Sequence, residues 1–182
     1  MAILKVARMG HPVLRKKCMP LDPATITGPE VQRLIRDMLE TMVEYNGVGL
    51  AAPQVYNPVR LLIAGGDEDE SGKAKLRVLI NPELTVLDEE RRLGMYEGCL
   101  SIPGLRGYVE RPAHIRVKAY DERGKQQEFE LEGFPAIVMQ HECDHLDGIL
   151  YPDRVEDRSK LGFEDEVQRF HDLGVDEDDQ DD

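Results

Sequence analysis

The stretch that organises the predicted fold is His141-Glu142-Cys143-Asp144-His145, near the end of a segment that runs from Gly133-Phe134-Pro135 to Gly148. Proline in the first turn and glycine after the last turn are typical helix boundaries, so this segment predicts an α-helix. Residues four apart lie on one face of a helix, so the imidazoles of His141 and His145 can reach one metal ion. The carboxylate of Glu142 lies at the flank of that face, near enough to a metal-bound water to exchange protons with it. These residue types indicate metal-assisted hydrolysis, which also requires a third ligand.

The strongest candidate for the third ligand is Cys99. It lies in a segment punctuated by Gly and Pro, Glu97-Gly98-Cys99-Leu100-Ser101-Ile102-Pro103-Gly104. Such a segment can hold a thiolate without a regular strand around it. Cys143 lies two residues after His141, about 200° around a helix, so it faces away from the metal and is interpreted as a small core residue.

Zinc proteases offer a rival interpretation, because they share the pattern His-Glu-x-x-His. Their longer pattern continues with a Gly and a third His; Gly148 matches the Gly, but Tyr151 stands where the third His should be. Another protease class takes a Glu from a later helix, and Glu164 or Glu166 is a candidate for that role. A protease therefore stays open at this point.

Composition restricts the class of protein. The 182 residues, 41% hydrophobic and 32% charged, fit one globular domain. No apolar run approaches the ~20 residues of a membrane span, and the amino terminus lacks a signal-peptide pattern, so we expect a cytoplasmic protein without membrane contact. Three widely spaced cysteines make a disulfide framework improbable. The net charge of −13 argues against direct nucleic-acid binding, which needs a basic surface.

The expected domain organisation is a single catalytic domain over residues 1–175 and a short tail. Six of the seven residues in 176–182 are acidic. A run of like charges with no apolar residue predicts a disordered, solubilising tail.

Periodicity predicts two further helices and an antiparallel β region. Thr27 to Glu30 is typical of a capping box and precedes an amphipathic helix, while residues 159–173 predict a carboxyl-terminal helix. Short β-branched or aliphatic runs predict strands at 60–64, 76–80, 83–87, 105–109, 115–120 and 127–131, with a loop at 65–74. The fold class is α+β, with antiparallel sheets packed around the central helix that bears the two histidines.

A glycine-rich segment follows the first helix and reads Gly47-Val48-Gly49-Leu50-Ala51-Ala52-Pro53-Gln54. Two glycines one residue apart allow a bound molecule or another backbone to approach closely. The segment lacks the Gly-Lys-Ser/Thr sequence of a phosphate loop, which excludes that kind of nucleotide site.

Three segments together, 47–54, 97–101 and 140–148, resemble in order and spacing the three signature motifs of peptide deformylase. The resemblance implies an α+β enzyme that removes the N-formyl group from the initiator methionine of newly synthesised polypeptides and releases formate. It implies a metal ion held by Cys99, His141 and His145, with water as the fourth ligand and Glu142 as general base and acid. Fe(II) is the metal associated with the family, and Zn, Ni or Co would suit the same ligands in purified protein.

The resemblance also implies roles for residues outside the helix. The backbone N–H of Leu100 and the side-chain amide of Gln54 would stabilise charge on the formyl oxygen. Gly49 would hydrogen-bond an extended substrate. The pocket for the methionine side chain would be lined by Val48, Ile137, Val138 and His141. From polarity alone, we expect Glu97 to pair with Arg111.

Partners and alternatives follow from the same comparison. Formylmethionyl nascent peptides are the expected partner, with transient ribosome association as a further expectation, although the acidic residues 176–182 would be repelled by RNA. An endoprotease and a non-catalytic, metal-stabilised binding module remain the alternatives. Glu142 and Gln54 argue against the binding module, because a structural metal site closes its fourth position and needs neither residue.

Overall fold

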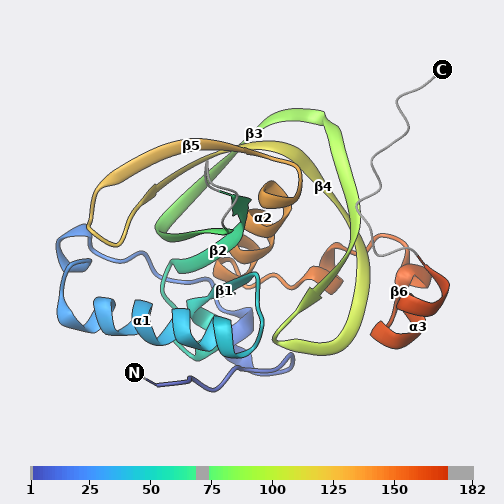
Figure 1. Ribbon diagram of the computed structural model, residues 1–182, viewed down its shortest axis with the longest axis horizontal. Coiled ribbons are helices and arrows are strands. Elements are labelled where there is room, and N and C mark those ends of the chain that lie inside the picture. The colour runs from blue at the N-terminus through green and yellow to red at the C-terminus, as the bar shows by residue number, and fades with distance from the viewer. Residues whose placement is uncertain (1, 69–73, 172–182) are drawn as a thin grey trace.

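The computed structural model describes residues 2–68 and 74–171 (Figure 1). The predicted acidic tail at 176–182, the last two residues of the predicted carboxyl-terminal helix and the middle of the predicted 65–74 loop lie outside these ranges.

The strands of the described residues form one antiparallel sheet in the order β1-β2-β3-β4-β5, with β6 paired to β4. Their bounds are Gly49–Ala51 (β1), Leu61–Glu68 (β2), Ala74–Cys99 (β3), Ile102–Tyr120 (β4), Gln126–Glu132 (β5) and Leu161–Phe163 (β6). All six predicted strands fall within these elements, apart from the first residue of the first, but the real strands are longer, and β1 and β6 were not predicted. The loop predicted at 65–74 was wrong at its ends, because residues 65–68 continue β2 and residue 74 begins β3.

β3 is long because irregularities interrupt its pairing without ending it. The register with β4 shifts between Ile80 and Glu83, where Asn81 adopts a positive φ of 52° and Pro82 cannot donate a ladder hydrogen bond. The sequence indicated two strands here because Asn and Pro usually end a strand. In the fold they bend a single strand that curves around the core.

The helices are α1 (Pro29–Glu44), α2 (Phe134–Leu146) and α3 (Glu164–Phe170). The predicted capping box was wrong: Gly28 is the N-cap of α1 and no side chain caps the helix, while Pro29 holds its first position. The carboxyl-terminal helix is shorter than predicted, because residues 158–160 form a 3₁₀ turn and 161–163 pair with β4 as β6. Within the described ranges no helix has the length and apolar character needed to cross a bilayer.

The core occupies both faces of β2, because side chains alternate along a strand. Leu62 and Ala64 pack toward α2, whereas Leu61 and Ile63 pack toward α1. In Figure 1, β3, β4 and β5 arch over α2, and α1 lies along the opposite side of the molecule. Ten of the thirteen residues of α2 are buried, including its charged and imidazole side chains. Because buried polar groups need hydrogen-bond partners, the polar side chains of α2 must contact other polar groups inside the protein. These contacts form the candidate site.

Candidate active site and metal centre

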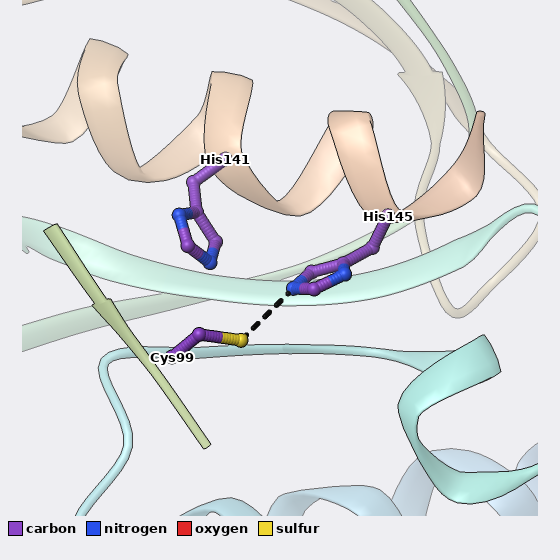
Figure 2. A group of neighbouring side chains, drawn as sticks. All are labelled: Cys99, His141 and His145. Carbon is purple, nitrogen blue, oxygen red and sulfur yellow. Dashed lines mark hydrogen bonds between the residues drawn. The ribbon is translucent and has the colours of Figure 1, made fainter. Parts of the chain in front are cut away.

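Cys99, His141 and His145 bring their side chains together at one point (Figure 2). Their ligand atoms all lie within 4.8 Å of one another. Figure 2 shows both imidazoles pointing from α2 toward Cys99 across a short gap. The Sγ atom of Cys99 lies 3.3 Å from Nε2 of His145. This is close to the roughly 3.5 Å expected for a sulfur and a nitrogen that bind one tetrahedral ion at 2.3 and 2.0–2.1 Å.

A tight turn presents Cys99 to the helix. Cys99 is the last residue of β3 and pairs with Ile102, the first residue of β4, so only Leu100 and Ser101 separate the strands. We expected an irregular segment at this point. The thiol is instead fixed at the end of a strand pair, which positions it more rigidly than a loop would.

A buried carboxylate orients His141. Oε2 of Glu97 lies 2.7 Å from Nδ1 of His141, so Nε2 of that imidazole is left to face the metal. Arg111 donates to both oxygens of Glu97, at 2.6 and 3.0 Å, in the pairing expected from polarity. Burial tends to raise the pKa of Glu97, but the hydrogen bonds from His141 and Arg111 outweigh it and lower that pKa to about 2. Glu97 therefore remains a carboxylate that can hold the ring in one orientation.

Arg111 also pairs with a second carboxylate, that of Asp144 on α2. Arg111 donates through Nη1 to Asp144 at 2.8 Å, and Arg154 donates to the other oxygen of Asp144 at 2.6 Å. Asp144 thus carries a buried charge on the same helix as the two histidines. We did not predict this role for Asp144 or Arg154. The partners of Asp144, which are Arg111 and Arg154, lie 33 and 10 residues away in the sequence, so no local pattern indicated this pairing.

Charges around the histidines favour a cation. Burial lowers the pKa of His141, but hydrogen bonds with Cys99 and Glu97 raise it well above its ordinary value. The pKa of His145 is lowered well below its ordinary value, chiefly by burial and then by the positive charge of His141. The space between the thiol and Glu97 therefore attracts one positive charge. A divalent cation bound to both rings satisfies the same negative neighbours, so these residues fit a metal ion.

Glu142 lies beside this centre and is nearly fully buried, with 4% of its surface exposed. Its Oε2 atom has no hydrogen-bond partner among the described residues. Burial raises the pKa of Glu142 to about 7, although the charge of His141 opposes the rise. A Cβ atom at position 49 would lie 2.4 Å from Oε1 of Glu142, so only glycine leaves room for the carboxylate there. This close approach accounts for Gly49.

Hydrogen bonds at both ends of its side-chain amide hold Gln54 beside Cys99. Its oxygen accepts a hydrogen bond from the N–H of Ala51 at 2.8 Å. Its Nε2 atom lies 3.2 Å from Oγ of Ser101 and 3.5 Å from Sγ of Cys99. Gln54 therefore presents a donor beside the ligand group, and Ser101, which we had not singled out, is one of the groups that hold it.

A cavity of about 770 Å³ opens onto these residues. Four residues that were expected to contact substrate line this cavity: Val48, Gly49, Ile137 and Val138. Leu100, in the turn between β3 and β4, also lines it. Met95 and Phe134 also line it and were not predicted, because neither belongs to a motif. The apolar wall and the candidate ligands thus share one cavity.

Tyr151 stands where the longer protease pattern would place a third His. Its hydroxyl donates to the carbonyl of Leu105 at 2.9 Å, and its ring stacks on His141 with centroids 6.1 Å apart. Among the described residues, the only three-ligand group takes Cys99, not Glu164 or Glu166. Glu164 pairs with Arg106. The described residues therefore do not support the alternative in which Glu164 or Glu166 is the third ligand.

A cysteine side chain and two imidazoles beside a buried carboxylate, on an α+β scaffold, define a metal-dependent hydrolase as the class of protein. A family model described as polypeptide deformylase matches residues 3–161. The peptide deformylase of Leptospira biflexa serovar Patoc is 41% identical over 172 residues, covering 92% of this chain and 96% of that protein. Peptide deformylase 1 of Bordetella pertussis is 44% identical over 162 residues, covering 87% and 90%.

Solved structures agree with this assignment. The class I type b peptide deformylase of Acinetobacter baumannii with bound Met-Ala-Ser superposes with a TM-score of 0.77 at 36% identity, covering 85% of this chain and 99% of that one. The Thermotoga maritima peptide deformylase gives a TM-score of 0.76 at 38% identity, covering 86% and 100%. The chain belongs to the polypeptide deformylase family. It is an enzyme that removes the N-formyl group from nascent peptides, and Cys99, His141 and His145 form its candidate metal site.

Proposed function

We propose that Cys99, His141 and His145 hold one divalent metal ion and that Glu142 is the general base and acid of formyl-group hydrolysis. The observation that carries this proposal is the convergence of three ligand atoms beside a buried carboxylate whose Oε2 atom has no partner among the described residues. An ion at this site would supply a Lewis acid for the formyl carbonyl and lower the pKa of water to about 7.

Glu142 moves the proton in this mechanism. Oε2 accepts a proton from the attacking water, and the same carboxyl group delivers it to the nitrogen that leaves as the free amine. Burial raises the pKa of this carboxyl group above its ordinary value, which brings its proton exchange closer to neutral pH and suits it to both steps.

Negative charge that develops on the formyl oxygen needs donors held in place before the reaction. We propose the amide of Gln54 and the backbone N–H of Leu100 for this role. The fixed orientation of the Gln54 amide supports it, because Ala51 and Ser101 hold its two ends.

Substrate binding would use an apolar pocket and a strand edge. Val48, Ile137 and Val138 would contact the methionine side chain. Among the described strands β1 pairs only with β2, so its outer edge offers backbone groups to an added strand, with Gly49 among them. Recognition through backbone groups would tolerate many downstream sequences.

We propose Fe(II) as the metal in the cell, with Zn, Ni or Co as substitutes in purified protein, because a Cys-His-His set accepts all of them. A thiolate beside ferrous ion predicts loss of activity in air through oxidation. Because nascent polypeptides emerge from ribosomes, we also propose a cytoplasmic location and transient ribosome association. The like charge of RNA and residues 176–182 argues against contact through that segment.

The test is an anaerobic formate-release assay combined with metal analysis. A formyl-Met peptide should give formate and a free amino terminus, whereas the unformylated peptide should remain intact. Internal cleavage of either peptide without formate would instead support an endoprotease and contradict the proposed chemistry.

A further inference from the structure

The outer part of the cavity carries unpaired positive charge in a protein of net charge −13. Lys5 and Arg8 line the cavity together with Cys99 and His141. Both side chains are exposed, and neither makes a salt bridge within the ranges that the structure describes. We call Lys5 and Arg8 the basic rim.

The acidic side chains of the same cavity are already engaged or buried. Glu164 is held by Arg106, whose Nε donates to it at 3.0 Å, so the two charges offset each other. Glu97 is paired with Arg111 inside the protein. Glu142 is buried at the metal centre. The charge that remains at the mouth of the cavity is therefore positive.

The segment that bears the rim is fixed to the catalytic elements. The N–H of Ala7 donates to the carbonyl of Gln54 at 2.7 Å, and the N–H of Met9 donates to the carbonyl of Ser101 at 2.8 Å. Ala7 is fully buried between the two rim residues. Because the backbone is already ordered, the two cations can meet a bound peptide without an entropic cost for the main chain.

We propose that Lys5 and Arg8 determine substrate specificity by favouring formylated peptides with an Asp or Glu among the first few residues after the methionine. This inference rests on the proposed function, because it places the peptide in the cavity beside the metal centre. An extended chain advances about 3.3–3.6 Å per residue, so residues after the methionine extend toward the mouth of the cavity, where the rim lies. A carboxylate there would be attracted, and a lysine repelled.

The sign of the effect separates this proposal from the influence of overall charge. The net charge of −13 would by itself favour peptides that contain lysine. A preference for aspartate therefore requires a local source of positive charge. Exposed pairs are weak and are screened by salt, so we expect a modest effect that disappears at high ionic strength.

The experiment measures kcat/KM for amidated formyl-Met peptides that carry Asp, Asn or Lys at the second, third or fourth position. For the wild-type holoenzyme at low salt, we expect Asp to exceed Lys by about three- to tenfold at one or more positions, and the ratio to approach one in 1 M salt. The double variant Lys5→Glu/Arg8→Glu should invert the ratio.

The matched control is Lys16→Glu/Lys125→Glu, which changes the net charge equally at two exposed lysines outside the cavity lining. This control should retain the wild-type ratio. A wild-type ratio of one or below at all three positions, an unchanged ratio in the rim variant, or an equal shift in the control would each overturn the proposal. If formate is released from the Asn peptides, such an outcome leaves the deformylase assignment intact, whereas absence of formate from every peptide contradicts the proposed function itself.

Discussion

Glu142 combines two properties that rarely occur together, a buried carboxylate and an oxygen without a partner among the described residues. An unpaired buried polar atom is costly for stability, and this cost supports the proposed role of the group in the reaction. The space for it exists only because residue 49 lacks a Cβ atom.

Replacement of Glu142 by Gln should abolish proton transfer while preserving the shape of the site. We expect kcat to fall by about 10²–10⁴-fold, the usual contribution of a general acid-base residue, with the metal content unchanged. Formate release and metal analysis on the same preparation test this. Near-normal turnover by a metal-loaded Gln variant would contradict the assigned role.

The acid side of the pH profile should also reflect Glu142. Burial raises its pKa to about 7, so the base form is lost as pH falls through that value. A bound cation adds positive charge nearby and lowers the pKa, so the midpoint of the acid limb of kcat/KM should lie between about 4.5 and 7. The measurement is kcat/KM from pH 4 to 9 on the metal-loaded enzyme. A flat profile over this range would remove Glu142 from the proton-transfer step.

At this scale the sequence predicted the residues that belong to motifs. His141, Glu142 and His145 follow from helical spacing, and Cys99 follows from its segment punctuated by Gly and Pro. The resemblance added Gln54. The role of Asp144 was not predictable, because its partner Arg111 lies 33 residues away and only the folded sheet brings them together. Met95 and Phe134 were missed for a similar reason, since apolar cavity residues carry no local pattern.

At the scale of elements, one ionic chain connects β3, β4, α2 and the turn after α2. It passes from Glu97 through Arg111 to Asp144 and ends at Arg154. Its first member contacts a candidate metal ligand, while its last members hold the helix against the sheet. The two ends should therefore respond differently to substitution.

Glu97→Gln should lower both metal affinity and stability, because Glu97 contacts His141 and also pairs with buried Arg111. Asp144→Asn should lower stability alone. Partners of metal ligands commonly contribute about 10–100-fold to metal affinity. Breaking a buried ion pair costs on the order of 3 kcal/mol of the free energy of unfolding. Metal titration and urea unfolding on both variants provide the test. If Asp144→Asn lost metal affinity without losing stability, the division of roles would be wrong.

The sequence predicted the existence of α1 and α2 but not the extent of the strands. Local turn residues such as Asn81 and Pro82 indicate an end, whereas pairing with β4 carries β3 through them as a bend. The carboxyl-terminal helix was overestimated for the same reason. Residues 161–163 have a partner in β4, and strand pairing there overrides helical periodicity.

At the scale of the whole molecule, α1 and α2 pack on opposite faces of β2, so the main core does not depend on the metal centre. The candidate ligands nevertheless come from two elements far apart in sequence, the end of β3 and α2. A bound ion therefore links elements that the core already holds close.

Removal of the metal should lower stability without unfolding the chain. Binding at 100 times the dissociation constant contributes about 2.7 kcal/mol, which corresponds to a fall of about 5–10 °C in Tm on chelation for a chain of this length. Thermal unfolding with and without chelator, followed by circular dichroism, measures this. Loss of secondary structure at 25 °C on chelation would contradict an independent core.

The most direct measurement of the central claim is a titration of metal into chelator-treated protein, under anaerobic conditions, with formate release followed at each addition. For the wild type, activity should rise in proportion to added metal and stop at one ion per chain. Cys99→Ala should neither retain the ion through gel filtration nor gain comparable activity. Equally tight binding by the Cys99→Ala variant, or full activity in metal-free wild type, would show that these three ligands do not form the hydrolytic centre.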